Sequence, residues 1–231
     1  MNYVISDIHN DNNRLKAMLK KISFNEDDHL YVLGDLFDRG GSVADPLGVY
    51  FTLLRIKDRC TFIRGNHDTW LAEYIYEYYR MPKKKLKNLR SYPYNSFGLL
   101  TERLPEADMI KLADTIMSWP VQVVKKIGDT EYIFAHAMSS ASDDIKEDNY
   151  YLMGNDIDFM YLRNGIEGAT VVNGHNHTST IREWYGDEYK PKKNEVWHNP
   201  QENLYMIDCG CGFSVGRLAC LRLEDKEEFY I

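Results

Sequence analysis

Acidic, amide and imidazole side chains recur directly after apolar runs along the chain. The first run, YVISDIH, ends in Asp7 and His9. The next four end in Asp35, Asp38 and Arg39 (YVLGDLFDRGG), Asn66 and His67 (FIRGNHD), His136 (YIFAHAM), and His175 and His177 (VVNGHNHT). In α/β sheets, ligands bind at the edge where the strands end, because the loops converge there. We therefore expect these side chains to meet at one edge of a sheet.

The recurring residue types favour a centre with two metal ions. Carboxylate and amide oxygens mixed with imidazole nitrogens suit Mn²⁺, Fe or Zn²⁺, and no thiolate belongs to the set. Six or seven such ligands are more than one tetrahedral ion needs. They suit two ions about 3.5–4 Å apart that share a carboxylate and a hydroxide. We expect two divalent ions, with manganese first and iron or zinc as the alternatives.

The elements that must position these residues read as strands alternating with helices. Seven short runs are rich in Val, Ile, Tyr and Phe, namely YVIS, HLYVLG, CTFIRG, EYIFAH, TVVNGH, LYMIDCG and LACLRL. Apolar residues at helical spacing from Leu15 to Ile22 predict an amphipathic helix capped by Asp11 or Asn12. DPLGVYFTLLRIK predicts a second helix, with Pro46 in its first turn. This order implies an α/β fold, and the sheet-like C-terminal part favours a mixed or two-sheet core.

Residues 69–118 interrupt the alternation of strands and helices. Their pattern is mostly helical and predicts a cap or insert within a single domain that covers residues 1–231. PKKKLKNLR carries five Lys or Arg residues, and a solvated helix face or loop is favoured over a patch that attracts an anionic substrate. Trp70, Tyr74, Tyr78 and Tyr79 lie at helical spacing, which favours packing over base stacking.

Composition narrows the class of protein. The net charge is 28 − 35 = −7 and the pI is about 5.5, which argues against broad binding to nucleic acid or anionic membranes. The apolar runs are shorter than the roughly 18 residues of a membrane span. The four cysteines form no C-x-x-C pair and are expected to be small buried hydrophobic residues. A reduced cytoplasmic protein is the natural expectation.

Five sequence blocks together resemble a known family. The blocks D-x-H, G-D-x-x-D-R-G, G-N-H-[ED], a lone His and G-H occur in this order between residues 7 and 178. The chain resembles the calcineurin-like metallophosphoesterases. The D-R-G in its second block resembles that of one branch of the family, which contains serine/threonine protein phosphatases, the small phage-type phosphatase and symmetrical diadenosine tetraphosphatases. The resemblance implies a mixed β-sheet sandwich flanked by helices, the calcineurin-like phosphoesterase fold.

The resemblance also implies which residues would bind the metal ions. One ion would be held by Asp7, His9 and Asp35. The second would be held by Asp35 as a bridge, together with Asn66, His136 and His175. The fifth block reads Gly174-His175-Asn176-His177 and is similar to the G-H-x-H of the wider superfamily, which makes His177 an additional candidate ligand. His29 and His198 are expected to be ordinary polar residues.

Four further residues receive catalytic roles from the resemblance. His67 would protonate the leaving oxygen, and Asp38 would orient the His67 ring. Arg39 would grip the phosphoryl oxygens, which a planar guanidinium can contact two at a time. In phage-type enzymes a second phosphate-binding arginine lies shortly before the G-H block, and DFMYLRNG puts Arg163 there.

The expected function is metal-dependent phosphoester hydrolysis. A metal-bridged hydroxide would attack a phosphomonoester, of the phosphoserine or phosphothreonine kind. The alternative substrate is a dinucleoside polyphosphate such as diadenosine tetraphosphate, and the insert would decide between them. A metal-binding scaffold without turnover is the non-enzyme alternative, which the presence of Asp35, Asn66 and His67 disfavours. Expected partners are a phosphorylated protein or a small phosphoester, with no nucleic acid and no membrane, and the oligomeric state stays open.

Overall fold

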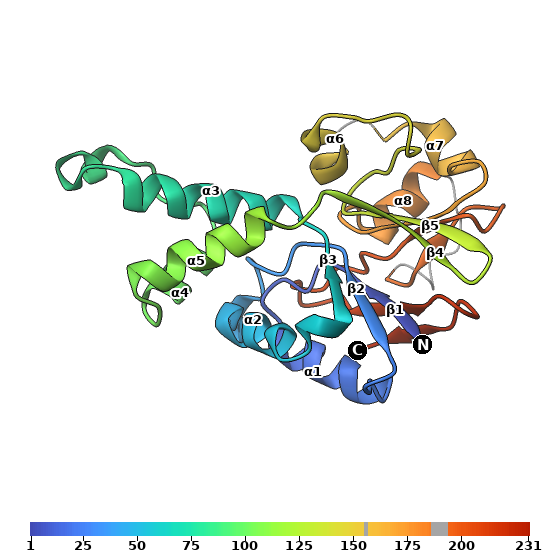
Figure 1. Cartoon of the computed structure of the whole chain (residues 1–231), viewed down its shortest axis with the longest axis horizontal. Helices are drawn as coiled ribbons and strands as arrows, with labels where there is room; N and C mark the ends of the chain where they lie inside the picture. Colours follow the sequence, from blue (N-terminus) through green and yellow to red (C-terminus); the bar gives the residue numbers. More distant parts are fainter. Residues whose placement is uncertain (155–156, 186–193) are drawn as a thin grey trace.

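Two β-sheets lie face to face as a sandwich in the computed structural model, which describes residues 1–154, 157–185 and 194–231 (Figure 1). The first sheet has the order β10 (Glu228–Tyr230), β9 (Ala219–Arg222), β1 (Asn2–Ile5), β2 (His29–Val32) and β3 (Cys60–Phe62). The second has the order β4 (Gln122–Ile127), β5 (Thr130–Ala135), β6 (Thr170–Asn173), β8 (Leu204–Met206) and β7 (Trp197–His198). The predicted mixed-sheet sandwich is confirmed.

Each sheet has a parallel centre. β1, β2 and β3 pair in parallel, and so do β5, β6 and β8. The outer strands β9, β10, β4 and β7 join antiparallel. Because parallel neighbours end at the same edge, the loops that follow the central strands are gathered there.

The core between the sheets follows from the alternation of side chains along each strand. Val4 and Tyr31 point into the sandwich with Phe134, and the Tyr31 and Phe134 rings stack with centroids 4.4 Å apart. Tyr3 and Ile5, one residue to either side of Val4, pack instead under the helices on the outer face. Burial on both faces explains why the central strands read as continuous apolar runs.

Helices cover both outer faces of the sandwich. The first sheet is covered by α1 (Asn12–Lys21) and α2 (Pro46–Leu54), with short 3₁₀ turns at Gly41–Val43 and Lys57–Arg59. The outer face of the second sheet is covered by α6 (Asp148–Met153), α7 (Phe159–Asn164) and α8 (Thr178–Tyr185). Asp11 caps α1 by accepting from the backbone N–H of Arg14, which decides between the two predicted caps. The predicted second helix ends at Leu54, three residues early.

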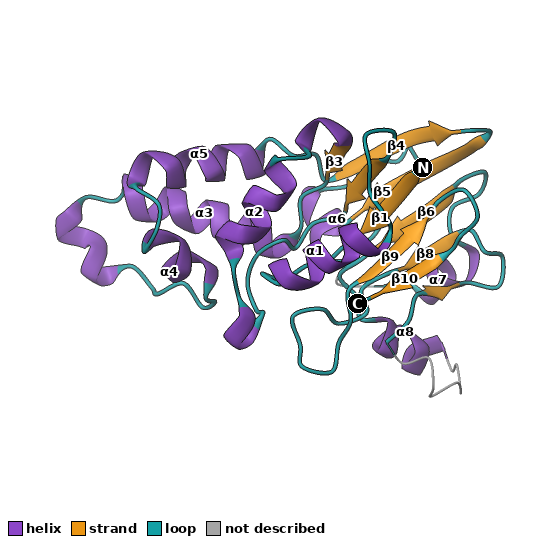
Figure 2. Cartoon of the chain, turned by 90° about the horizontal axis from the view of Figure 1, so that it is seen from below, coloured by secondary structure: helices purple, strands orange, loops and turns teal. Residues whose placement is uncertain are grey.

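A helical arm projects from the sandwich between β3 and β4. It consists of α3 (Asn66–Arg80), a 3₁₀ turn (Lys83–Asn88), α4 (Ser96–Thr101) and α5 (Glu106–Met117), and Figure 2 shows α3 and α5 side by side. Their facing sides bury Leu71, Ile75 and Leu112. The arm coincides with the helical insert expected at 69–118. The single-domain organisation stays a prediction.

All seven predicted runs contain strands, whereas β4, β7 and β10 were not predicted. β7 has two residues and β10 three, too few for a periodicity to show. β4 is half exposed and carries two lysines, and of its six described residues only Val123 and Ile127 pack against the core between the sheets, so its apolar pattern is weak. Among the helices that the structure describes, none combines the length and the apolar character needed to cross a bilayer.

Candidate metal centre

The loops that follow β1 and β2 are locked together at the edge of the sheet. The backbone N–H of Asp7 donates to Gly34 O, and that of His9 donates to Asp35 O, both at 3.0 Å. Gly34 has φ +85°, and a Cβ there would lie 2.4 Å from the backbone nitrogen of Gly65 in the loop after β3. Glycine is therefore required where these two loops meet.

Four of the predicted metal ligands have left-handed backbone conformations. The φ angles of Asp7, His9, Asp35 and His175 are 53°, 48°, 52° and 61°. Such a conformation costs a residue other than glycine about 1–3 kcal/mol and persists only where the surrounding structure enforces it. Here it turns each side chain back toward the same point at the strand ends.

Asp35 belongs to two groups of possible ligand atoms. One group is Asp7, His9 and Asp35, and the other is Asp35, His136 and His175; within each group the atoms lie within 4.8 Å of one another. Oδ2 of Asp35 lies 3.7 Å from Nε2 of His9, whereas Oδ1 lies 3.4 Å from Nε2 of His136. The two oxygens of one carboxylate thus face two different sets of donors.

Asn66 lies beside the second group. It is the first residue of α3 and is buried, and its Oδ1 lies 2.9 Å from Nε2 of His136. His67 N donates to Oδ1 of Asp35 at 2.9 Å, which fixes the start of α3 against the loop after β2.

Backbone carbonyls orient the buried imidazoles. Nδ1 of His9 lies 3.0 Å from Phe37 O, and Nδ1 of His136 lies 2.7 Å from Leu33 O. A carbonyl can only accept, so Nδ1 carries a proton and Nε2 faces the cluster, the orientation that metal-binding histidines require. Asp7 is held similarly, because its Oδ2 accepts from Ser6 Oγ and His175 N, at 2.6 and 2.9 Å.

Charge in the cluster is arranged for cations. Burial lowers the pKa of His9 and of His175 to about 4, so both are neutral imidazoles at pH 7. Burial also opposes a charge on His136, but the carboxylate of Asp35 outweighs it and raises the His136 pKa to about 10. Burial would raise the pKa of Asp35, and His136 instead holds it well below its usual range. Two buried carboxylates, an amide oxygen and three imidazoles, of which His136 must lose a proton to an incoming ion, are a donor set that fits divalent ions.

The second predicted feature is a pair of polar residues beside the cluster. Nδ1 of His67 lies 2.9 Å from Oδ2 of Asp38, and both side chains are buried. Nη1 of Arg39 lies 2.9 Å from Nε2 of His9, and its Nη2 lies 3.3 Å from Nε2 of His67. The guanidinium therefore bridges the candidate ligands and the candidate acid, and the structure brings these residues together.

Comparison with known proteins agrees with this geometry. Residues 3–229 match the family model of the calcineurin-like phosphoesterases. The chain belongs to this family. The resemblance predicted from the motifs is thereby confirmed.

Individual relatives of this calcineurin-like phosphoesterase carry several names. A symmetrical bis(5'-nucleosyl)-tetraphosphatase of Buchnera aphidicola subsp. Acyrthosiphon pisum (strain Tuc7) is 43% identical over 67 residues, 29% of this chain and 23% of the relative. The fold is shared with a solved structure titled "Crystal structure of a putative diadenosine tetraphosphatase", with a TM-score of 0.65 and 20% sequence identity. The match covers 100% of this chain and 92% of that one. The fold is also shared with a serine/threonine protein phosphatase of Saccharomyces cerevisiae, with a TM-score of 0.55 and 13% sequence identity. That match covers 100% of this chain and 78% of the phosphatase. The chain thus spans about a quarter of the length of the curated relative that it matches.

His177 lies at the margin of the cluster of this phosphoesterase. Its Nε2 lies 3.4 Å from Oδ2 of Asp208, and its side chain is 34% exposed. Asp208 is buried, and its Oδ2 has no hydrogen-bond donor among the residues that the structure describes. The sequence analysis missed Asp208, although it follows the apolar run LYMID as the other candidates follow theirs. His177 remains a candidate ligand.

Arg163 does not lie with the other predicted catalytic residues. It is exposed, and its backbone carbonyl accepts from Nδ2 of Asn199 at 3.3 Å. Asn199 also binds Asn203, whose carbonyl accepts from Val171 N near the start of β6. Arg163 is therefore placed at the sheet edge opposite to the one where β6 leads into His175. The spacing to the G-H block could not reveal this, because α7 ends before the chain enters the strand.

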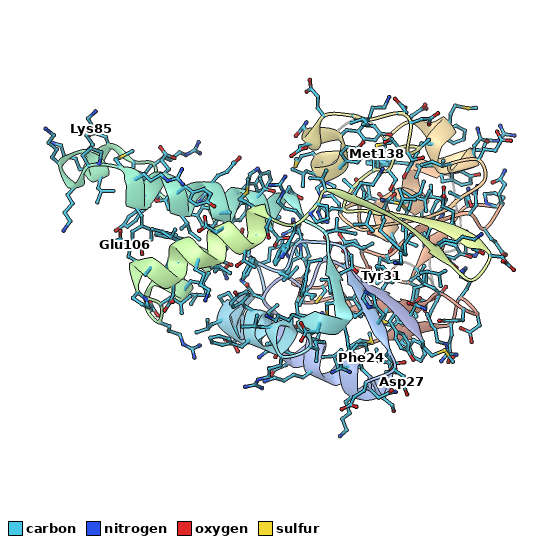
Figure 3. All side chains as sticks on the ribbon, in the orientation of Figure 1. Phe24, Asp27, Tyr31, Lys85, Glu106 and Met138 are labelled. Atoms are coloured by element: carbon cyan, nitrogen blue, oxygen red, sulfur yellow. The ribbon has the colours of Figure 1, made fainter. Side chains whose placement is uncertain are left out.

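The remaining expectations concern residues outside the cluster. His29 binds Thr61 and His198 binds Asn199, so both are satisfied polar residues as expected. All four cysteines are free, and three of them are buried. The basic segment Lys83–Asn88 lies at the tip of the arm, where Figure 3 labels Lys85, far from the strand ends.

Proposed function

We propose that this chain is a dinuclear-metal hydrolase of phosphomonoesters. The observation that supports this most strongly is the carboxylate of Asp35, whose two oxygens face two separate groups of donor atoms. A bridging carboxylate of this kind is what a pair of ions about 3.5–4 Å apart needs. The family membership supports the same chemistry.

In this proposal the first ion is bound by Asp7, His9 and Asp35, with His177 as a further ligand. The second is bound by Asp35, Asn66, His136 and His175. Manganese is proposed first, and iron or zinc would suit the same donors. When bound, such a pair supplies a hydroxide near neutral pH and neutralises charge on the phosphoryl oxygens.

The side chains beside the ions handle the phosphoryl group and the proton. Arg39, whose Nη atoms face Nε2 of His9 and Nε2 of His67 in the structure, would turn its N–H groups to the equatorial phosphoryl oxygens, where charge builds up in the transition state. His67, whose Nδ1 is oriented by Asp38, would give a proton from Nε2 to the leaving oxygen. One P–O bond forms from hydroxide, the P–O bond to the leaving group breaks, and the products are phosphate and an alcohol.

Two finer substrate classes belong to this proposal. Phosphoserine and phosphothreonine of proteins are supported by the D-R-G form of the motif. Dinucleoside polyphosphates are supported by the names of the relatives. A polyphosphate needs further cations along a channel, and the lysines expected to supply them lie instead at the tip of the arm. The four free cysteines also support a reducing, cytoplasmic location.

The test is a parallel assay of the Mn²⁺-loaded full chain with an aryl phosphate, a phosphoserine peptide and diadenosine tetraphosphate. The proposal expects turnover of the aryl phosphate and of the phosphopeptide, and loss of both in Asp35→Asn. Turnover of diadenosine tetraphosphate alone would show that the substrates are dinucleoside polyphosphates and not phosphomonoesters. Metal-loaded protein that hydrolyses none of the three across several divalent ions would favour a binding scaffold instead.

A further inference from the structure

An aromatic pocket borders the candidate acid His67. The pocket has a volume of about 330 Å³ and is formed by α3 and the segment that leads into α4. Trp70 and Tyr94 contribute parallel rings, with centroids 5.9 Å apart and an interplanar angle of 5°. Tyr92 lines the same pocket. The two rings are stacked on one another beside an open space at the base of the arm.

The pocket lies where a leaving group would be. The His67 ring contacts Trp70 and Tyr94 edge-on, with centroids 5.0 and 4.5 Å away. Its Nε2 faces Arg39 and the metal-ligand cluster, so the atom that takes its proton lies between the cluster and these rings. A leaving group on that atom that extends past the His67 ring would contact Trp70 or Tyr94.

Exposure separates these rings from the packing aromatics of the arm. Tyr78 packs against Tyr79 and Phe97 within the arm, as the sequence analysis expected. Tyr94 in contrast is 39% exposed and faces the pocket beside Trp70. A stacked pair of large rings with one of them exposed, beside a candidate catalytic residue, is a surface that a ligand can cover.

Two carboxylates give the pocket its polarity. Glu73 and Glu77 are one helical turn apart on α3, are exposed, and line the same space. Ionised carboxylates only accept hydrogen bonds, and they repel phosphate. They match the exocyclic amine of adenine or cytosine, whereas a phenyl ring offers them no donor. A pocket that combines an aromatic ring for stacking with carboxylate acceptors has the features needed to bind a nucleobase.

We propose that this pocket binds the nucleobase of the leaving group, so that the preferred phosphomonoesters are nucleoside phosphates whose base carries an exocyclic amine. The proposal rests on the proposed hydrolase function, because the pocket adjoins the candidate acid. The stacked Trp70–Tyr94 pair offers a ring face on which the base stacks, and Glu73 or Glu77 accepts from its amine. Stacking of one base on an aromatic side chain corresponds to about 5- to 150-fold in binding.

The first experiment measures binding without catalysis. Adenosine is titrated into the metal-free full chain, and quenching of tryptophan fluorescence is followed. We expect saturable quenching that Trp70→Leu removes and that Trp184→Leu retains, because Trp184 is an exposed tryptophan on α8 outside the pocket. Quenching that persists in Trp70→Leu, or none in the unmodified chain, would overturn the pocket assignment even if the hydrolase function holds.

The second experiment measures specificity as ratios of kcat/KM in the Mn²⁺-loaded chain. The substrates are adenosine 5'-monophosphate, inosine 5'-monophosphate, glycerol 2-phosphate and a phosphotyrosine peptide. We expect adenosine monophosphate to exceed glycerol phosphate by at least about tenfold, a ratio that Tyr94→Leu lowers and Trp184→Leu retains. The double variant Glu73→Gln, Glu77→Gln should bring the adenosine-to-inosine ratio toward one.

Three results separate the possible failures. Equal kcat/KM for adenosine monophosphate and glycerol phosphate would overturn the pocket proposal while the hydrolase stands. A preference for the phosphotyrosine peptide over adenosine monophosphate would assign the rings to a phenyl group instead. No turnover of any phosphomonoester, with adenosine binding intact, would overturn the proposed function and leave the pocket as a nucleoside-binding site.

Discussion

The hydroxyl of Tyr92 lies 2.6 Å from Oδ2 of Asp38, the oxygen that also accepts from His67. Ser96, at the start of α4, binds the same residue, because its Oγ accepts from Asp38 N at 2.6 Å. The arm is therefore tied to the pair that presents the candidate acid. Burial and the nearby Asp38 carboxylate raise the pKa of Tyr92, so its phenol stays protonated and can only donate to that carboxylate.

Tyr92→Phe should lower kcat without changing metal binding. The variant removes one hydrogen bond to a charged group, worth about 1.5–3 kcal/mol, and loosens the Asp38 carboxylate that orients His67. We expect a decrease of roughly tenfold or more in kcat on an alkyl phosphate, measured in steady state with saturating Mn²⁺. Tyr76→Phe is the matched control, since its hydroxyl binds Asp114 on the arm's surface. Equal losses in the two variants would mean that the arm only stabilises the fold.

His67→Ala should slow substrates with poor leaving groups most. General acid catalysis contributes about 10²–10⁴-fold where the leaving oxygen must be protonated, and far less for an aryl phosphate. We expect kcat/KM on an alkyl phosphate to fall within that range and the aryl phosphate to lose much less. Comparable losses on both substrates would remove His67 from the acid role.

Much of the site was predictable because its residues sit at the ends of apolar strands. Parallel strands of one sheet bring their ends to one edge, so Asp7 and Asp35 could be assigned to one place without coordinates. His175 follows a strand of the second sheet, and the packing of the two sheets brings it to the same cluster. The sandwich was predictable for a related reason, since the chain remains sheet-like after β6. Short motifs with fixed residue types carry this information locally.

Other parts of the site depend on contacts between distant segments. Tyr92 reaches Asp38 across 54 positions, and no periodicity in the sequence links the two. The same holds for Arg163, whose side of the sheet is decided by where α7 ends relative to β6. Asp208 could have been found, because it ends the apolar run LYMID, which was itself predicted as a strand.

Asp68→Asn should destabilise the fold by about 1–3 kcal/mol, the cost of leaving buried donors unsatisfied. The Asp68 carboxylate is fully buried and accepts from the backbone N–H groups of Asp35, Leu36 and Gly65, at 2.8, 2.9 and 3.0 Å. An amide loses one of its two acceptor oxygens. Urea unfolding of the metal-free chain measures the change, with Asp27→Asn at an exposed position as the control. A change below about 0.5 kcal/mol, as at a surface site, would contradict this role.

Metal binding should release about one proton at pH 7 and tighten as the pH rises. The pKa of His136 is raised to about 10, so its imidazole carries a proton at neutral pH that an ion must displace. His9 and His175, with pKa values lowered to about 4, are already neutral and release none above about pH 5. Calorimetry of Mn²⁺ binding in two buffers with different ionisation enthalpies measures the release. Heats that do not depend on the buffer would contradict it.

The sharing of Asp35 between two ions is the claim on which the account depends. Crystals of the chain soaked in Mn²⁺ and measured at the manganese absorption edge test it directly. The account predicts two anomalous peaks about 3.5–4 Å apart, one on the His9 side of Asp35 and one on the His136 side. A single peak, or two peaks without Asp35 between them, would contradict it.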